Sequence, residues 1–590
     1  MVNVPSGNTY TTSGHYNLPP TNCDASHWVI IQSDHLALLP AQGNRISAST
    51  ANMPTLSTSN FADSVIVAAD NPATPLNAVG SACTATGGGA STVPCGYWLA
   101  GLDIEDDPPN TGTNQLALLQ IGDYCNIGGG GCPITSGMSA KNLASRFTID
   151  RCWIHPTQAT SNILHGIRFT ASYLAVEDSI VEAHYTQIGG TGQTTGISSD
   201  FTIGPVDIGN SEIMAVTENM IFGGNDPAIT NSVPSDIYIH QNYIHKRPEW
   251  FDGVNTGYFE TKMRNWIECK NCQRMLVEGN VFDRDDGNSV SAAFQFTPRN
   301  VFGTCTWCVI QDVTIRYNKV SNLSDLVEII GANGASSGGS TGPELPSKRI
   351  SLHDNIVENV NDITFGGNGR IAELLTGDAT ASGCSGTPNS SLCQMSDIII
   401  THNTIAGADG VGGGVRNLAT LGSNGGASPP ASSDKGFNLV YTNNIVPAGA
   451  FLLSNDAGTS SNPISGPFAT YWSSFAFDRN VITGIAAACC TTSQFTSPTC
   501  NYSGTSGCTG TDALGWAATM SNVGFVNYNS GSGGDYHLST SSIYHNQALD
   551  GTDVGANVDT VNSYTSGVLQ GTPTLAITLP NSQLAPQPPH

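Results

Sequence analysis

The chain has 590 residues, and only 11% of them are Asp, Glu, Lys or Arg, well below the roughly 25% of an average globular protein. The 46 acidic residues outnumber the 21 lysines and arginines, which argues against nucleic acid as a partner because phosphate binding needs clustered positive charge. No run of 18 apolar residues occurs, so no membrane insertion is expected. The abundance of Gly, Ser, Thr and Asn is typical of an all-β protein with many turns.

The N-terminal region predicts a cap followed by strands. Residues 1–60 hold one apolar segment, HWVIIQS, before a stretch rich in Pro and Ser, and they predict an entry or cap segment. Apolar runs such as SVIVAAD and YWLAGLDIE then mark the first strands. We place one repetitive domain at residues 61–485, which begins with these strands.

Short segments repeat along this domain. MAVTENMIF (214–222), VTIRYNKVS (313–321), IIITHNTIA (398–406) and FAFDRNVIT (475–483) align without gaps. Each alternates apolar and polar residues as a strand with one buried face does, and each carries an Asn at the same place. That Asn tolerates the left-handed conformation of a tight bend and can hydrogen-bond to its copy in the next repeat.

A second strand series lies between the Asn-bearing segments. It includes WIECKN (266–271), FQFTPRN (294–300), LVEIIGAN (326–333) and IAELLTGD (371–378). Irregular spacing with at least two strands in each repeat predicts a single-stranded right-handed parallel β-helix with long loop insertions. Residues 486–534 form a Cys-, Gly- and Ser-rich insertion, and residues 535–590 form a C-terminal cap and tail.

The 16 cysteines, several of them close together in loops, indicate disulfides and an oxidising compartment. We therefore expect a secreted, extracellular protein whose signal peptide has been removed, and we expect a monomer. Two Cys-x-x-Cys pairs, Cys269/Cys272 and Cys305/Cys308, predict a disulfide clamp between coils, with zinc as the alternative.

Three segments carry a resemblance to known proteins: ENMIFGGNDP (218–227), VPSDIYIHQNYIHKRPEW (233–250) and IECKNCQRMLVEGNVF (267–282). With the Asn-bearing strands, they resemble secreted bacterial right-handed β-helix proteins of the pectate-lyase-like superfamily over residues 140–485. The resemblance implies a carbohydrate-active enzyme with a polysaccharide as its partner. A Glu, Lys and Arg series is similar in part to the β-helix alginate and chondroitin lyases.

The first predicted mechanism is β-elimination of a uronic-acid polymer. Lys270 and Arg299 end successive strands of the second series, which predicts that they are neighbours on one face. A lysine beside an arginine is pushed towards the neutral form and can act as a base. Lys270 is thus the predicted base and Arg299 the group that neutralises the substrate carboxylate. Glu268 and Asp285 complete the predicted catalytic set.

Further residues are predicted to bind the substrate or a metal. The resemblance implies a calcium ion held by acidic residues, for which Glu260, Glu268 and Asp283 are the candidates; no organic cofactor is expected. The predicted substrate-binding residues lie in loops that follow the strands, where Trp stacks on sugars and cations hold carboxylates. They are Lys246, Arg247, Trp250, Asp226 and Asn271.

Two alternatives remain open. The first is a glycoside hydrolase that uses paired carboxylates, with Asp283, Asp285, Asp286, Glu268 and Glu278 as candidates. The second is a glycan-binding surface protein without catalysis, in which the charged cluster of residues 263–300 has no chemical role.

Overall fold

The computed structural model describes most of the chain and divides it into two compact units. Unit 1 comprises Met1–Ile267, Cys272–Met275 and Ser566–His590, and unit 2 comprises Glu268–Asn271 and Leu276–Thr565. The described residues are 1–21, 27–60, 63–68, 94–107, 109, 117–122, 143–158, 161–184, 194–200, 202–227, 229–251, 263–285, 292–332, 344–377, 394–407, 414–424, 430, 432, 434–449, 452–455, 465–484, 502–503, 516–517 and 519–577.

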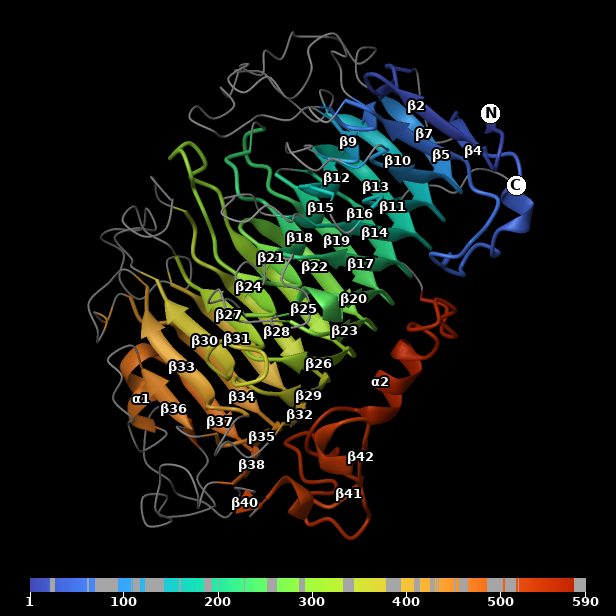
Figure 1. Ribbon diagram of the computed structural model, residues 1–590. Helices are drawn as coiled ribbons and strands as arrows, with labels where there is room; N and C mark the ends of the chain where they lie inside the picture. The colour runs from blue at the N-terminus through green and yellow to red at the C-terminus, as the bar shows by residue number, and fades with distance from the viewer. Residues whose placement is uncertain are drawn as a thin grey trace. The chain divides into compact units, whose positions relative to one another are not determined.

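The strands fall into three long sheets, named A, B and C here, and successive strands enter the sheets in rotation (Figure 1). From β1 to β38, neighbouring strands of one sheet are therefore three apart in chain order, and they pair in parallel. Each turn of the chain thus supplies one strand to every sheet. This topology is a right-handed parallel β-helix, which confirms the predicted fold class.

Unit 1 contains strands of all three sheets. Sheet A has β1 (Val2–Val4), β4 (Val29–Ser33), β7 (Cys95–Ala100), β10 (Ala144–Asp150), β13 (Ala171–Glu177), β16 (Val206–Gly209) and β19 (Ser235–His240). Sheet B has β2 (Thr9–Thr12), β5 (Thr55–Thr58), β8 (Asp103–Glu105), β11 (Trp153–His155), β14 (Ile180–Ala183), β17 (Glu212–Ala215) and β20 (Tyr243–His245). Sheet C has β3 (Tyr16–Asn17), β6 (Ile66–Ala68), β9 (Leu119–Ile121), β12 (His165–Phe169), β15 (Thr195–Ser199) and β18 (Glu218–Phe222).

Unit 2 repeats the pattern. Sheet A has β25 (Ile310–Arg316), β28 (Lys348–His353), β31 (Ser396–Thr401), β34 (Phe437–Thr442), β37 (Phe475–Asp478) and β39 (Tyr502–Ser503), of which β39 is antiparallel. Sheet B has β23 (Val281–Asp283), β26 (Lys319–Leu323), β29 (Ile356–Val360), β32 (Thr404–Ala406), β35 (Ile445–Pro447), β38 (Val481–Thr483) and β40 (Trp516–Ala517). Sheet C has β24 (Phe294–Phe296), β27 (Val327–Ile330), β30 (Arg370–Thr376), β33 (Asn417–Ser423) and β36 (Leu453–Asn455).

The remaining elements are short. Strands β21 (Ile267–Cys269) of sheet C and β22 (Cys272–Glu278) of sheet A have residues assigned to both units. The strands β41 (Phe525–Asn527) and β42 (Asp535–Leu538) form an antiparallel pair. The helices are η1 (Leu36–Leu38), η3 (Pro248–Trp250), α1 (Ser465–Tyr471), η7 (Met520–Asn522), η8 (Asn529–Gly531) and α2 (Val558–Thr565).

The core follows from the alternation of apolar and polar residues. In sheet A of unit 1, Val176, Ile208 and Ile239 stack with their side chains fully buried. Burial of each such side chain contributes about 1.5–3 kcal/mol. The alternate residues of the same strands, such as Glu177 and Asp207, point to the opposite face. Functional side chains of the coils are therefore expected on the outer faces of the three sheets.

An asparagine ladder stabilises the corner between sheets A and B in unit 2, as the repeat predicts. The amide of Asn318 donates to Asn355 Oδ1 (2.9 Å), and that of Asn355 donates to Asn403 Oδ1 (3.0 Å). The same bonds continue through Asn444 to Asn480. The left-handed residue is not the ladder asparagine but the one before it, such as Asp354 (φ 52°). The prediction that the Asn itself adopts this conformation is wrong.

Unit 1 uses serine at the corresponding corner. Ser179 Oγ accepts from Cys152 N (3.0 Å), Ser211 Oγ accepts from Ser179 N (3.2 Å), and Asn242 Oδ1 accepts from Ser211 N (2.8 Å). Asn219, which the repeat places in the ladder, lies in β18 of sheet C and donates to the carbonyls of Ile213 and His245.

Both chain ends differ from their predicted roles. Residues 1–60 are not a separate cap, because β1 to β5 already pair with strands of the following coils. In unit 2, part of the C-terminal segment lies along the outer face of sheet B rather than capping its end. Tyr536, Ala556 and Val561 there pack against Ile356 and Ala406 (Figure 1).

The cysteine prediction is corrected in one respect. Cys305 and Cys308 form a disulfide with each other, so that pair closes a local loop and does not clamp two coils. Cys269 and Cys272 are also disulfide-bonded, which removes the thiolates that a zinc site would need. In the part of the chain that the structure describes, no helix has the length and apolar character to cross a membrane.

Candidate functional site

Three glutamates lie in a row on the outer face of sheet C in unit 2. Gln295 on β24 pairs with Glu328 on β27, and Glu328 pairs with Glu373 on β30. Glu268 lies on β21, the strand before β24. Because neighbouring strands are roughly 4.8 Å apart, these side chains form a continuous polar row. We call Glu268, Gln295, Glu328 and Glu373 the glutamate row.

In the first half of the row, Glu268 forms an ion pair with a lysine and Glu328 accepts a hydrogen bond from an amide. The Lys270 ammonium forms an ion pair with Glu268 and donates a hydrogen bond to Thr297 Oγ1 (2.6 Å). Gln295 Nε2 donates to Glu328 Oε1 (3.1 Å). Glu268 and Glu328 are both buried. Glu268 is thus paired with a lysine, whereas Glu328 accepts a hydrogen bond from a neutral amide.

The second half of the row contains two carboxyl groups, Glu328 and Glu373, whose pKa values are raised. Burial raises the pKa of Glu373 to about 8; the Arg370 guanidinium opposes the shift, and the charges of Glu328 and Asp325 and a hydrogen bond with Glu328 add to it. Burial also raises the pKa of Glu328, despite the amide of Gln295. Two adjacent carboxyl groups cannot both ionise in such a place. Burial and mutual repulsion therefore favour the protonated form in the Glu328–Glu373 pair.

Arg370 orients this pair. Its guanidinium forms an ion pair with Glu373 and bonds Asp325 through Nε (2.8 Å). Asp325 in turn accepts from the backbone N–H of Asn368 (2.8 Å). The side chains of Glu373 and Lys270 remain 13% and 15% exposed. The row thus presents an acid and a base, each held by a cation, with partial access from solvent.

The predicted pairing of Lys270 with Arg299 differs from the structure. The Lys270 side chain contacts Glu268 and Thr297, and it is the backbone N–H of Arg299 that donates to the Lys270 carbonyl (3.0 Å). Burial lowers the pKa of Arg299, and the carboxylates of Glu268, Glu328 and Glu344 oppose this shift. Arg299 thus lies near the carboxylates of the row. The charged partner of the Lys270 ammonium, however, is the Glu268 carboxylate and not a second cation.

The predicted calcium ligands do not converge. Glu260 lies outside the described residues. Glu268 lies on sheet C, whereas Asp283 ends β23 of sheet B and accepts from Ser321 Oγ (3.0 Å) and Asn322 Nδ2 (2.5 Å). Asp285, predicted to be catalytic, is buried after β23, and its backbone N–H donates to the Asn322 carbonyl (2.9 Å). Asp286 also lies outside the described residues.

Two of the residues predicted to bind sugar are buried in the protein and cannot contact a ligand. Lys246 is fully buried, and its Nζ donates to the carbonyls of Ala215 (3.2 Å) and Thr217 (2.9 Å). Trp250 is also fully buried and meets the edge of His184, so its ring face cannot stack on a sugar. Both predictions are corrected, because a loop after a strand can fold onto the strand ends whose carbonyls need donors.

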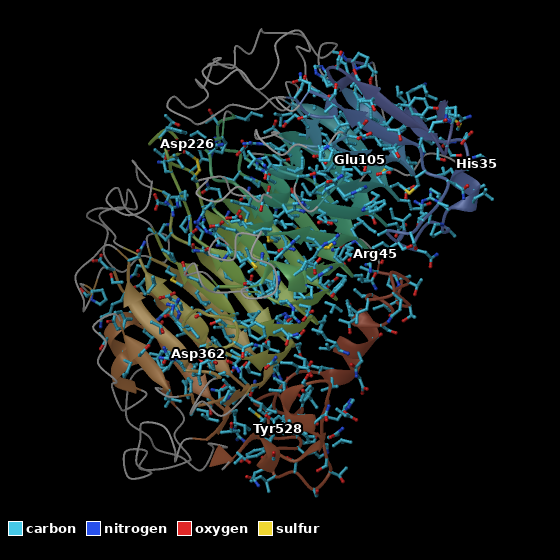
Figure 2. All side chains as sticks on the ribbon, viewed as in Figure 1. His35, Arg45, Glu105, Asp226, Asp362 and Tyr528 are labelled. Carbon is cyan, nitrogen blue, oxygen red and sulfur yellow. A yellow bond between two sulfur atoms is a disulfide. The ribbon has the colours of Figure 1, made fainter. Side chains whose placement is uncertain are left out.

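The other predicted binding residues are less exposed than expected. Asn271 bonds the Arg299 carbonyl (2.8 Å). Asp226, labelled in Figure 2, is buried in the loop after β18. Arg247 keeps part of its side chain exposed and forms ion pairs with Glu182 and Glu249. Of these three, only Arg247 offers a partly exposed charge.

A pocket of about 480 Å³ lies in unit 2 beside the C-terminal segment, and the sequence analysis missed it. Tyr317 and His402 line it from the coil corners, and Tyr536, His537 and Asp550 line it from the C-terminal segment. His537 contacts Asp535 (2.5 Å) and Asp559 (3.1 Å). Burial lowers the pKa of His537, but hydrogen bonds to these two carboxylates raise it above its ordinary value.

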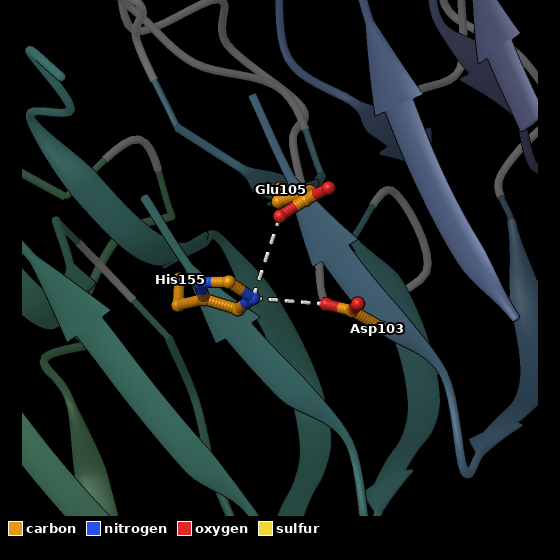
Figure 3. Close-up of side chains that lie close together, drawn as sticks. All are labelled: Asp103, Glu105 and His155. Carbon is orange, nitrogen blue, oxygen red and sulfur yellow. Dashed lines mark hydrogen bonds and ion pairs between the residues drawn. The ribbon is translucent and has the colours of Figure 1, made fainter. Parts of the chain in front are cut away.

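Among its described residues, unit 1 holds two groups of metal-binding residue types. In the first, Asp103 and Glu105 of β8 face His155 of β11 (Figure 3). In the second, Glu177, Asp207 and His240 come from three strands of sheet A. Their ligand atoms lie within 4.8 Å of one another in each group. Burial and the neighbouring Asp103 raise the pKa of Glu105 to about 7, although His155 opposes this.

Comparisons with known proteins give little beyond the fold. Neither the protein-family models nor the curated proteins include a match. Among solved structures, PfbA, a surface adhesin of Streptococcus pneumoniae, is 12% identical with a TM-score of 0.32, over 82% of both chains. The Dettilon tailspike protein is 13% identical with a TM-score of 0.29, over 72% of this chain and 69% of that one. Such weak likenesses carry no argument about function.

The sequence held a signal for the glutamate row that the analysis did not use. The second strand series reads Phe-Gln-Phe, Val-Glu-Ile and Ala-Glu-Leu in successive coils. Aligned on the apolar residues, it places Gln295, Glu328 and Glu373 at one outward position. Attention to residues repeated on the outer face, instead of local charge density, would have identified the row.

Proposed function

We propose that the chain is a polysaccharide-processing enzyme and that the glutamate row hydrolyses a glycosidic bond. The observation that carries this proposal is the alignment of Glu328 and Glu373 on adjacent strands, in the same row as Glu268, which is ion-paired with Lys270. Carboxyl groups whose environments separate their protonation states supply an acid and a base at one pH. Glycoside hydrolysis requires that pair.

The roles follow from the protonation states. Glu328, the member of the pair nearer to Glu268, donates a proton to the leaving glycosidic oxygen and regains it from Glu373, and Glu268 accepts a proton from the water that attacks the anomeric carbon. Glu268 and Glu328 lie on strands separated by one intervening strand, so their backbones are roughly 10 Å apart. Inverting enzymes hold their two carboxyl groups about 6.5–9.5 Å apart. The backbone separation is closer to this range than to the about 5–5.5 Å of retaining enzymes, so the proposed outcome is inversion.

Hydrolysis fits the geometry better than β-elimination. The lyase mechanism needs a neutral lysine, and Lys270 contacts a carboxylate and a hydroxyl in place of a second cation. A panel of neutral and uronic-acid polysaccharides separates the two reactions. New reducing ends without ultraviolet-absorbing product support the hydrolase, and inversion can be followed by NMR. An unsaturated, ultraviolet-absorbing product would overturn it in favour of the lyase.

A second candidate function is glycan binding at the unit 2 pocket. Its volume of about 480 Å³ lies in the range of small-ligand sites. Tyr317 and Tyr536 supply rings and Asp550 and Asp553 supply acceptors for sugar hydroxyls. Binding of oligosaccharides should be measured by calorimetry for the wild type and Asp550→Asn. Binding that persists in a Glu373→Gln variant and is lost in Asp550→Asn would assign it to this pocket.

We also propose that the protein works outside the cell. The Cys305–Cys308 disulfide and the bonded state of Cys269 and Cys272 support this proposal, because structural disulfides persist in oxidising compartments. Cell fractionation tests it: we expect the protein in the culture medium or at the cell surface, and recovery only from the cytosol would contradict the proposal.

A further inference from the structure

Two coils of sheet B in unit 1 carry nearly the same side chains. In the first, Trp153 and His155 of β11 pair with Asp103 and Glu105 of β8. In the second, Tyr243 and His245 of β20 pair with Glu212 and Met214 of β17. The two sites share an aromatic residue, a histidine and one carboxylate. They differ in the fourth position, which is Glu105 in one and Met214 in the other.

Surrounding contacts fix the orientation of His155. Its ring stacks on Trp153 with centroids 3.7 Å apart. Its Nδ1 lies 2.9 Å from the carbonyl of Pro156, and since a carbonyl only accepts, Nδ1 carries a hydrogen. In the neutral imidazole the lone pair is then on Nε2. This is the arrangement that outer partners impose on metal-binding histidines.

Nε2 points at two carboxylates (Figure 3). It lies 3.0 Å from Asp103 Oδ1 and 3.6 Å from Glu105 Oε2. The second oxygen of Asp103 accepts a hydrogen bond from Thr55 Oγ1 (2.9 Å), which orients that carboxylate. A lone pair facing two carboxylates is favourable only when a cation lies between them, whether a proton or a metal ion.

The distances fit a metal ion. Ligand atoms at 2.0–2.1 Å from a tetrahedral zinc ion are about 3.3 Å apart. The observed separations of 3.0 and 3.6 Å lie on either side of this value. All three side chains are at least four-fifths buried but keep some access to solvent, which suits three protein ligands and one open position.

We propose that Asp103, Glu105 and His155 bind a divalent transition-metal ion such as zinc. One imidazole nitrogen and two carboxylate oxygens favour zinc, manganese or cobalt over calcium, which takes oxygen ligands. The companion site of Glu212 and His245 lacks the second carboxylate, because Met214 takes its place. There the single His245–Glu212 bond (2.9 Å) satisfies both groups.

The test uses the full chain after removal of metal by a chelator. Calorimetry with zinc chloride should show a site that Glu105→Met weakens by about 100-fold or more, since loss of even an outer partner costs 10–100-fold. Glu105→Met copies the companion coil and preserves side-chain volume. The matched control, His245→Gln, alters the companion site and should leave the zinc affinity unchanged.

Two further measurements identify the ligands and test whether the metal binds to the folded chain. The absorption spectrum of the cobalt-loaded chain should show nitrogen and oxygen ligands without the sulfur charge-transfer band that a cysteine site would give. Zinc should raise the melting temperature of the wild type and of His245→Gln but not of His155→Gln. Absence of zinc binding in the wild type, equal binding by Glu105→Met, or a selective response to calcium would each overturn the proposal.

Discussion

The two units build similar coils but balance their outward carboxylates with different partners. In unit 2, Glu268 and Glu373 form ion pairs with Lys270 and Arg370. In unit 1, Asp103 and Glu105 lie beside His155, a group that exchanges its proton or binds a metal. The corners differ as well, with an asparagine ladder in unit 2 and a serine ladder in unit 1.

This difference explains how the same β-helix fold can support acid and base groups in one unit and a metal site in the other. Carboxylates crowded together bind protons more tightly, and a fixed cation keeps only some of them ionised. The glutamate row therefore separates an acid from a base. A histidine between two carboxylates has no fixed charge to contribute, so its site accepts a metal ion. The following predictions test this comparison.

The largest effect is expected from Glu373→Gln. The amide cannot supply a proton to Glu328, so kcat should fall by about 10²–10⁴-fold. Release of reducing ends from the best substrate of the panel measures this loss. Glu249→Gln, the same change at an exposed residue that pairs with Arg247, is the control. Full activity in Glu373→Gln would remove the glutamate row from the mechanism.

The pH dependence of activity and of stability should show that Glu373 has a higher pKa than an ordinary carboxyl group. Because the pKa of Glu373 is raised to about 8, kcat/KM should decline about tenfold per pH unit above about pH 8. The folded chain binds this proton more tightly than the unfolded chain. Its stabilising contribution is therefore complete below about pH 4.3 and is lost as the pH rises through about 8.

Stability curves of the wild type and Glu373→Gln across this pH range measure that contribution. The difference between the two free energies of unfolding should shift as the pH rises from about 4.3 to 8, because only the wild type loses the proton. A constant difference over the whole range would show that the pKa of Glu373 is not raised. The proposed separation of an acid from a base in unit 2 would then be wrong.

A smaller effect is expected from Lys270→Gln. The hydrolase mechanism uses Lys270 to hold Glu268, so its replacement should lower kcat by about tenfold, less than Glu373→Gln does. Lys348→Gln, at a lysine of sheet A outside the row, serves as the control. If Lys270→Gln instead abolishes activity while Glu373→Gln retains it, the lysine is the base and the lyase mechanism replaces the hydrolase.

The corner ladders should differ in stability. Asn355 donates to the Ile315 carbonyl (3.0 Å) and to Asn403 Oδ1 (3.0 Å). Asn355→Ala should lower the free energy of unfolding by about 1–3 kcal/mol, because buried partners lose their bonds. Ser211→Ala should cost about 1 kcal/mol, since one short hydroxyl is removed. Denaturant midpoints measure both, and equal costs would contradict the contrast between the ladders.

Local patterns allowed much of the scaffold to be predicted. Alternation of apolar residues placed β25, β31 and their equivalents correctly, because an inward side chain must be apolar whatever its neighbours are. The short N-terminal strands β1 to β3 were missed, since two to four residues are too few to show a period. Lys246 was misjudged because its burial depends on carbonyls from other strands.

The sequence by itself determined the β-helix, the asparagine ladder and the outward position of the glutamates, because each depends on a residue and its near neighbours along the chain. Only the tertiary structure decided which outward residues meet. The Lys270 ammonium contacts Glu268 and Thr297, and Asp103, Glu105 and His155 come together from strands about 50 residues apart. Turn lengths between coils set this register, and the free energy of stacking whole coils outweighs any local preference.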